Sequence, residues 1–205
     1  MITTPRLALA LLGLSLSVAG GCARDAGDED GADAADTQPA IEAAPVSAGA
    51  AAPAPTDPQI AHIAVTANAI DVEIARLAQD RTSTPEVLAF ARTMITDHTA
   101  VNERAAALAG RLGVTPEDNP VSQSLQGGAA EATAHLSGLE GEAFDRAYIE
   151  REVAYHQAVL DALDQTLIPG ATNAELRGLL EEVRPAIAAH LDHARALQAG
   201  ARTGP

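Results

Sequence analysis

Apolar residues recur with a period near 3.6 from Pro58 almost to the C-terminal end, and this pattern constrains the fold more than any other feature of the chain. The period matches one face of an α-helix and differs from the two-residue alternation of a β-strand. It divides into four amphipathic stretches, at residues 58–80, 85–112, 142–167 and 173–198. Because each stripe can be buried only against other helices, the pattern predicts an all-α four-helix bundle.

Helix start and stop signals mark several of these boundaries. Thr84 and Pro85 are the residue types preferred at the N-cap and at the first helical position. Gly113 is a typical C-terminal stop, and Pro169-Gly170 is expected to end the third stretch.

The segment between the second and third stretches is predicted to be a long connection. Residues 114–141 contain Pro116, Pro120 and four glycines, which favour turns and loops, so only a short helix is expected there, near residues 129–136. In the last stretch, Pro185 lies on the outer side of the helix, where it removes one backbone hydrogen bond and bends the axis.

The composition agrees with helices and excludes one class of partner. Aromatic residues make up 2% of the chain, whereas hydrophobic residues make up 47% and are mostly of helix-compatible types. The formal net charge is −15, so a polyanion would be repelled, and we expect no nucleic-acid partner.

The N-terminal segment predicts export. Arg6 precedes an apolar run over residues 7–19, which has the composition of a secretory signal and is shorter than the roughly 20 residues that span a bilayer. Residues 1–21 are therefore expected to be a signal peptide, followed by Cys22, the single cysteine, as the site of lipid attachment. Ordinary signal-peptidase cleavage nearby is the alternative. Retention of a Cys22→Ala variant in the membrane fraction would contradict lipidation.

The remaining boundaries follow from composition. Residues 22–57 are rich in Ala, Pro, Gly and acidic residues and are expected to form a disordered linker. The bundle is expected over residues 58–199 and a disordered tail over 200–205. The chain is thus predicted to lie on the periplasmic side, as an outer-membrane lipoprotein whose partner is the membrane and whose oligomeric state is open.

Three histidines project from the predicted helices toward the bundle interior. His98 lies near the centre of one apolar stripe, His190 lies within another, and His156 follows Glu152 by one helical turn. With Glu73 beside the stripe of the first helix, these residues are candidate ligands of a transition metal, because imidazole and carboxylate donors inside helical bundles hold such ions.

Two observations weigh against that site. His190 is expected about two turns away from the level of His98 and His156. The Glu-x-x-His signature of di-iron bundles is absent, since Ile95, Val153 and Ile187 stand three residues before the histidines. The alternative is that the histidines are neutral and buried, with hydrogen bonds to Glu152, Tyr148, Tyr155 or Asn102 (His62, His135 and His193 are expected to face solvent).

Two halves of the chain resemble domain-of-unknown-function family 4142. The resemblance rests on the runs AIDVEIARLA (69–78), STPEV (83–87), MITDH (94–98), FDRAY (144–148) and PAIAAHL (185–191), together with His156. It implies a ferritin-like four-helix bundle in an exported bacterial protein, often described as a predicted outer-membrane protein, and it implies no established activity. His98, His156 and His190 match histidine positions of the family pattern.

Three functions remain open at this point. The leading expectation is a non-enzymatic lipoprotein with a role in the cell envelope or in stress tolerance, because no nucleophile motif and no phosphate-binding loop is present. The second is a metal-binding or ferroxidase-like protein that uses the histidines and glutamates above. The third is a carrier of a small ligand in a cavity between Ala-rich helices.

Overall fold

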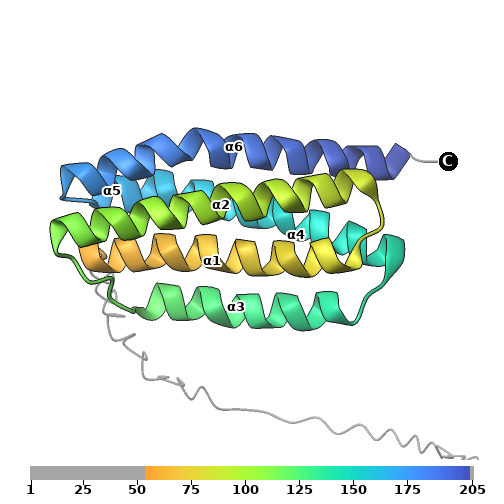
Figure 1. Cartoon of the computed structure of the whole chain (residues 1–205), viewed down its shortest axis with the longest axis horizontal. Coiled ribbons are helices and arrows are strands. Elements are labelled where there is room, and N and C mark those ends of the chain that lie inside the picture. Colours follow the sequence, from red (N-terminus) through yellow and green to blue (C-terminus); the bar gives the residue numbers. More distant parts are fainter. Residues whose placement is uncertain (1–53, 204–205) are drawn as a thin grey trace, which may run out of the picture. The chain divides into compact units, whose positions relative to one another are not determined.

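The computed structural model describes residues 54–203, and this part of the chain is helical with short connections (Figure 1). The elements are α1 (Asp57–Arg81), α2 (Pro85–Leu112), α3 (Pro120–Ser137), α4 (Gly141–Ala162), a π-helical segment (Leu163–Leu167), α5 (Ile168–Gly170) and α6 (Ala174–Thr203). No strand occurs within residues 54–203, so the predicted all-α class is confirmed. The predicted signal peptide, Cys22 and most of the predicted linker lie outside the described residues.

The four long helices of the bundle form two antiparallel pairs. Helix α1 packs closely against α2, and α4 packs closely against α6 (Figure 1). Gly113 ends α2 in the left-handed conformation, with φ of 64°, as its position in the sequence predicts. The α1–α2 turn is held to α4 by the hydroxyl of Thr84, which donates to Asp145 Oδ2 over 2.5 Å.

A fifth long helix, α3, lies along α1 and corrects the prediction of a mostly irregular connection (Figure 1). Asn119 caps its start, with the side-chain oxygen accepting hydrogen bonds from the backbone N–H groups of Val121 and Ser122, each over 3.1 Å. Gly127 and Gly128 lie inside the helix, although glycines in this segment were expected to favour a turn or loop. Glycine costs about 1 kcal/mol relative to alanine in a helix, which a good cap and the burial of Leu136 offset.

The third predicted helix is longer than expected. Its axis does not end at Leu167, because the π-helical segment and α5 carry it on to Gly170. Asp57 then ties the start of the chain's last helix to α1: its carboxylate accepts from the backbone N–H groups of Thr172, over 2.8 Å, and Asn173, over 2.9 Å.

Helix α6 continues to Thr203, so the predicted disordered tail from residue 200 is wrong for the described residues 200–203. Pro185 lies inside α6 and is exposed, as predicted.

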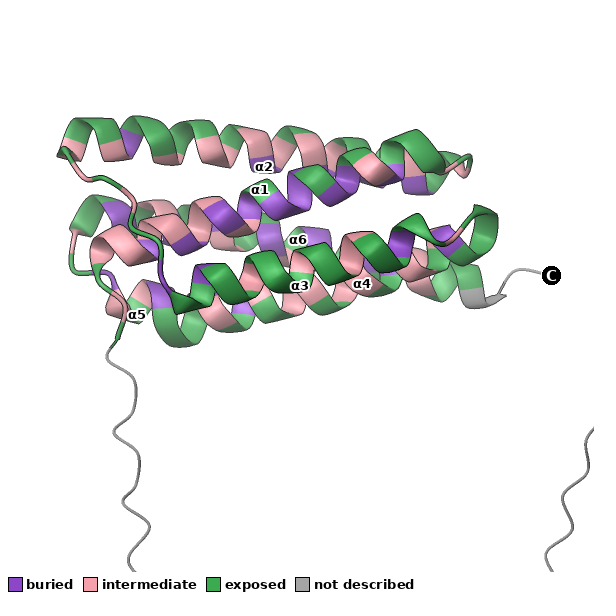
Figure 2. Ribbon diagram, turned by 90° about the horizontal axis from the view of Figure 1, so that it is seen from below, coloured by how far each residue is buried: buried purple, intermediate pink, exposed green. Residues whose placement is uncertain are grey.

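Two apolar cores lie along the bundle, and buried polar side chains separate them. Figure 2 shows the buried residues, in purple, distributed along the helices. We call the first the aromatic core; its largest members are Tyr148, Phe90 and Phe144. We call the second the aliphatic core; it includes Ile60, Leu163, Leu180 and Leu191. None of the helices within residues 54–203 combines the length and the hydropathy required to cross a bilayer.

Candidate metal centre

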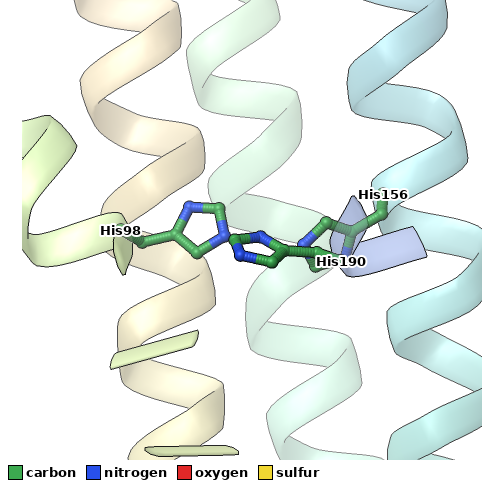
Figure 3. Close-up of side chains that lie close together, drawn as sticks. All are labelled: His98, His156 and His190. Carbon is green, nitrogen blue, oxygen red and sulfur yellow. The ribbon is translucent and has the colours of Figure 1, made fainter. Parts of the chain in front are cut away.

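Three imidazole rings meet in the layer between the two apolar cores (Figure 3). His98 comes from α2, His156 from α4 and His190 from α6, and their exposed fractions are 4%, 1% and 7%. The ring centroids are 5.2 Å apart for His98 and His190, 5.5 Å for His156 and His190, and 5.6 Å for His98 and His156. The three histidines therefore form one cluster, which we call the histidine triad.

The outward nitrogen of His98 is held by an amide from α1. His98 Nδ1 lies 2.6 Å from Oδ1 of Asn68, and the amide nitrogen of Asn68 in turn donates to the carbonyl oxygen of Ala64 over 2.9 Å. The second bond orients the amide so that its oxygen faces the ring. His98 Nδ1 consequently carries the proton, and its Nε2 is left with a lone pair.

The outward nitrogens of the other two rings are held in the same manner. His156 Nδ1 donates to the backbone oxygen of Glu152 over 3.0 Å and lies 3.3 Å from Glu152 Oε2. His190 Nε2 lies 2.9 Å from Oδ2 of Asp97. By contrast, the remaining nitrogen of each ring, which is Nε2 of His98 and His156 and Nδ1 of His190, is buried and has no hydrogen-bond partner within the described residues.

The three rings lie close enough to share an ion. One nitrogen from each ring of the triad lies within 4.8 Å of one from each other ring. A carboxylate oxygen joins them: Oδ2 of the fully buried Asp71 lies 3.1 Å from His98 Nε2 and 4.0 Å from His156 Nε2. Asp71 Oδ2 has no hydrogen-bond partner among residues 54–203 either, so an unpartnered oxygen lies beside the unpartnered nitrogens of His98 and His156.

A half-buried arginine balances the carboxylates of the layer. Nη1 of Arg151 lies 2.7 Å from Asp71 Oδ1 and 2.5 Å from Glu152 Oε1, and both carboxylate side chains have an exposed fraction of 0%. The guanidinium carbon lies 4.0 Å from the centroid of the Tyr155 ring, and the Tyr155 hydroxyl donates to the backbone oxygen of Ala67 over 2.8 Å. The arginine is thereby fixed between α1 and α4.

The environment shifts the pKa values of the three histidines in different directions. Burial lowers the pKa of His98 to about 4 and also lowers that of His190, in spite of its bond to Asp97. For His156, the cost of burial is outweighed by the hydrogen bond to Glu152 and by the charges of Asp71 and Glu152, so its pKa is raised. At neutral pH, the triad consequently contains two neutral imidazoles that are ready to act as donors.

The two carboxylates also differ. Burial opposes ionisation of Asp71, but the charges of His98, Arg151 and His156 outweigh it and lower its pKa. Burial raises the pKa of Glu152, and the charge of Asp71 raises it further. Asp71 is thus the permanent anion of the layer.

The structure brings together most of the predicted ligands. His98, His156, His190 and Glu152 lie in the layer, whereas Glu73 is exposed on α1 and does not approach it. Two residues advance a helix by about 200°, so Glu73 points away from the bundle when Asp71 points in. Asp71 is the carboxylate that α1 supplies.

The predicted offset of His190 is wrong. That estimate took Leu167 as the end of the third predicted helix, whereas the helical axis continues to Gly170 before α6 begins. The three additional residues account for about 4.5 Å of the difference, and the His190 ring lies 5.2 Å from that of His98 and 5.5 Å from that of His156. Of the four hydrogen-bond partners expected for buried histidines, only Glu152 is observed. The other two observed partners, Asn68 and Asp97, were not expected.

Sequence reasoning also missed Asn68, Asp97 and Arg151. Asn68 and Asp71 are three residues apart on α1, so both face α2, and this spacing of polar residues inside an apolar stripe was the available signal. Nothing in the local sequence distinguishes Arg151 or Asp97 from surface charges. Among the remaining histidines, His135 and His193 are exposed as expected, while His62 is half-buried.

An apolar cavity of about 110 Å³ adjoins the layer on the side of the aliphatic core. It is lined by residues of α1, α2, α6 and the π-helical segment, including Ala64, Ala105, Leu163 and Val183. A cavity of about 150 Å³ is known to hold benzene, so this void is small for a carrier site. Its lining is apolar apart from Asp57, Asn68 and Asn173, so polar groups for recognition are few.

Comparisons with known proteins give a family and a fold. The family model described as "Domain of unknown function (DUF4142)" matches residues 42–197. Among solved structures, "CopM in the Cu(II)-bound form" is similar, with a TM-score of 0.55 and 16% sequence identity over 71% of this chain and 98% of that chain. At that identity the likeness concerns the fold alone. No curated protein matches the sequence.

Proposed function

We propose that this chain, which belongs to the family described as domain of unknown function 4142, binds one divalent transition-metal ion at the histidine triad. The ligands are His98 Nε2, His156 Nε2, His190 Nδ1 and a carboxylate oxygen of Asp71. The function is to hold the ion, because side chains that are at most 7% exposed suit retention better than turnover of a substrate.

The observation that carries this proposal is that only one of the two nitrogens of each ring is hydrogen-bonded. The outward nitrogens bind Asn68, Glu152 and Asp97, and the inward nitrogens have no partner among the described residues. Metal-ligating histidines have this arrangement, since the outer N–H is held by a carbonyl or carboxylate and fixes the tautomer. Three unpartnered buried nitrogens would otherwise each cost about 1–3 kcal/mol.

The donor set favours copper(II) or zinc(II). Three imidazoles and one carboxylate suit these ions, and copper(II) binds most tightly among the divalent first-row metals. At metal–nitrogen bonds of about 2.0 Å, tetrahedral ligand atoms lie roughly 3.3 Å apart, so the side chains would move inward to bind an ion. The similar bundle of CopM was solved in a Cu(II)-bound form, which supports the same choice.

Metal binding at this site exchanges with a proton. Without metal, the positive charge of Arg151 faces the carboxylates of Asp71 and Glu152, and the raised pKa of His156 favours its protonated form. An ion can bind His156 Nε2 only after its proton leaves, so binding releases a proton and strengthens as the pH rises.

We further propose that the site operates on the periplasmic side of a membrane. The support is the signal-like segment over residues 1–21 and Cys22 as a lipid-attachment site.

The test is metal stoichiometry in protein prepared without a histidine tag. We expect about one copper(II) or zinc(II) per chain by elemental analysis, and a rise in melting temperature that grows with metal concentration. The variants His98→Leu, His156→Leu and His190→Leu should lose the ion. His135→Leu is the control, because His135 is exposed on α3. Folded wild-type protein that binds less than about a tenth of an equivalent of either metal would refute the proposal.

A further inference from the structure

Within residues 54–203, Arg151 is the one arginine that touches both buried carboxylates of the polar layer. A single nitrogen, Nη1, lies 2.7 Å from Asp71 Oδ1 and 2.5 Å from Glu152 Oε1. Its position between two oxygens from α1 and α4 is the position that a bound metal ion takes in a carboxylate site of a helical bundle.

The residues around this nitrogen are themselves a group with metal-ligand geometry. One donor atom each of Asp71, Glu152 and His156 lie within 4.8 Å of one another, and all three side chains are buried. Oε2 of Glu152 has no hydrogen-bond partner in the described part of the chain, although His156 Nδ1 lies 3.3 Å away. The negative charge at this place is therefore balanced by Arg151 and incompletely satisfied by hydrogen bonds.

Asp71 connects this position to the histidine triad. Its Oδ2 faces His98 Nε2 and His156 Nε2, whereas its Oδ1 faces Arg151. One carboxylate thus bridges two neighbouring cation positions. The first is the proposed metal site at the triad, and the guanidinium fills the second.

We propose that Arg151 occupies a second cation site, formed by Asp71 and Glu152, and thereby restricts the bundle to one metal ion. This inference rests on the proposed function in one respect, which is that the triad holds the first ion. Removing the guanidinium opens the second site to a divalent cation that prefers oxygen ligands, such as manganese(II), because its donors here are carboxylate oxygens.

Solvent can reach the second site to complete the coordination of such an ion. A groove of about 600 Å³ runs between α1, α3 and α4, and Arg151 and Tyr155 are among its lining residues. The side chain of Arg151 is 14% exposed, while those of Asp71 and Glu152 are fully buried beneath it. Replacing Arg151 therefore exposes the two carboxylates toward this groove, where water can enter.

The experiment measures manganese(II) binding by zinc-loaded protein. Zinc(II) has no unpaired electrons, so the electron paramagnetic resonance signal of free manganese(II) reports only the second site. We expect Arg151→Met to bind about one manganese(II) per chain and wild type to bind none. Arg146→Met is the matched control, because Arg146 is an exposed arginine on the same helix, and it should also bind none.

A charge-preserving variant separates charge from packing. Arg151→Lys retains a cation near the carboxylates, so it should exclude manganese(II) as wild type does. If Arg151→Met folds and binds no manganese(II), the proposal is wrong. If Arg151→Met is unfolded without metal, recovery of the helical signal on adding manganese(II) supports the proposal, and failure to recover contradicts it, since a second ion would supply the missing positive charge.

The outcome also separates this inference from the proposed function. If wild type binds no zinc(II) but Arg151→Met binds one manganese(II), the triad is refuted as a metal site and the site under Arg151 is retained. One zinc in both proteins and no manganese(II) in either would retain the triad and refute the second site.

Discussion

The aliphatic core and the polar layer beside it occupy the same bundle but are stabilised by different interactions. In the aliphatic core, side chains such as Ile60, Leu163 and Leu180 are held by shape and apolar area, so residues of similar volume can replace one another at modest cost. In the polar layer, a buried donor or acceptor that is satisfied depends on one partner in one orientation, as with His98 and Asn68.

This difference indicates that the layer is present for a reason other than stability. Leucines at these positions would remove the cost of burying two carboxylates, an arginine and three imidazoles, and buried ion pairs are often replaced by apolar residues without loss. The layer instead leaves several polar atoms without a partner among residues 54–203, including Asp71 Oδ2 and His190 Nδ1. A metal ion at the triad would supply the missing partner.

The largest expected effect is that of removing the carboxylate at the centre of the layer. Asp71→Ala leaves the charge of Arg151 and of protonated His156 with Glu152 alone, and we expect the free energy of unfolding of the metal-free protein to fall by about 3–5 kcal/mol. Urea denaturation measures it. Asp80→Ala, at an exposed position of the same helix, should change stability by less than about 0.5 kcal/mol. A similarly small loss for Asp71→Ala would mean that the layer is no more demanding than the surface.

The next effect is an acid destabilisation that arises in the polar layer. The folded-state pKa of His98 is about 4, against an ordinary value of 6.5, so as the pH falls through this window the unfolded chain takes up a proton that the folded chain does not. At about 1.4 kcal/mol per pH unit, roughly 3 kcal/mol of stability should be lost between about pH 6.5 and about pH 4. Lowering of the His190 pKa acts in the same direction.

His156 acts in a different pH range. Its folded-state pKa is raised, so the stability that its protonation contributes is complete below about pH 6.5 and is lost as the pH rises through the folded value. Denaturation of chelator-treated protein at several pH values tests both effects. His98→Leu should flatten the acid side by about 3 kcal/mol, and an unchanged slope in that variant would show that other groups cause the loss.

The smallest effect concerns the aliphatic side. Ala105 lines the cavity of about 110 Å³, so Ala105→Leu should fill part of it and raise the free energy of unfolding by about 1 kcal/mol. Ala106→Leu, at an exposed neighbouring position, should have almost no effect. A loss of stability for Ala105→Leu, measured by thermal denaturation, would indicate that the apolar side is packed as strictly as the layer.

Much of this molecule could be predicted from the order of its residues. The helix boundaries at Pro85 and Gly113 follow from local preferences for the first helical position and for positive φ, which act within a few residues. The burial of His98, His156 and His190 follows from helical periodicity, because a residue inside an apolar stripe turns inward with it.

Helix α3 and the level of His190 could not be predicted in this way. Helix formation by residues with weak local preference, as at Gly127, depends on packing against other helices. The level of His190 depends on how far the axis continues through the π-helical segment, and one additional turn moves a side chain by about 5.4 Å.

The sequence by itself thus determined that the chain forms amphipathic helices and which apolar face of each helix turns inward, since both follow from a periodicity of about one helical turn. The tertiary structure alone decided which of those side chains meet. It brought Asp71, and not Glu73, to the histidines, and it set Arg151 between two carboxylates. Those contacts join residues far apart in the chain, and the relative rotation and axial shift of packed helices determine them.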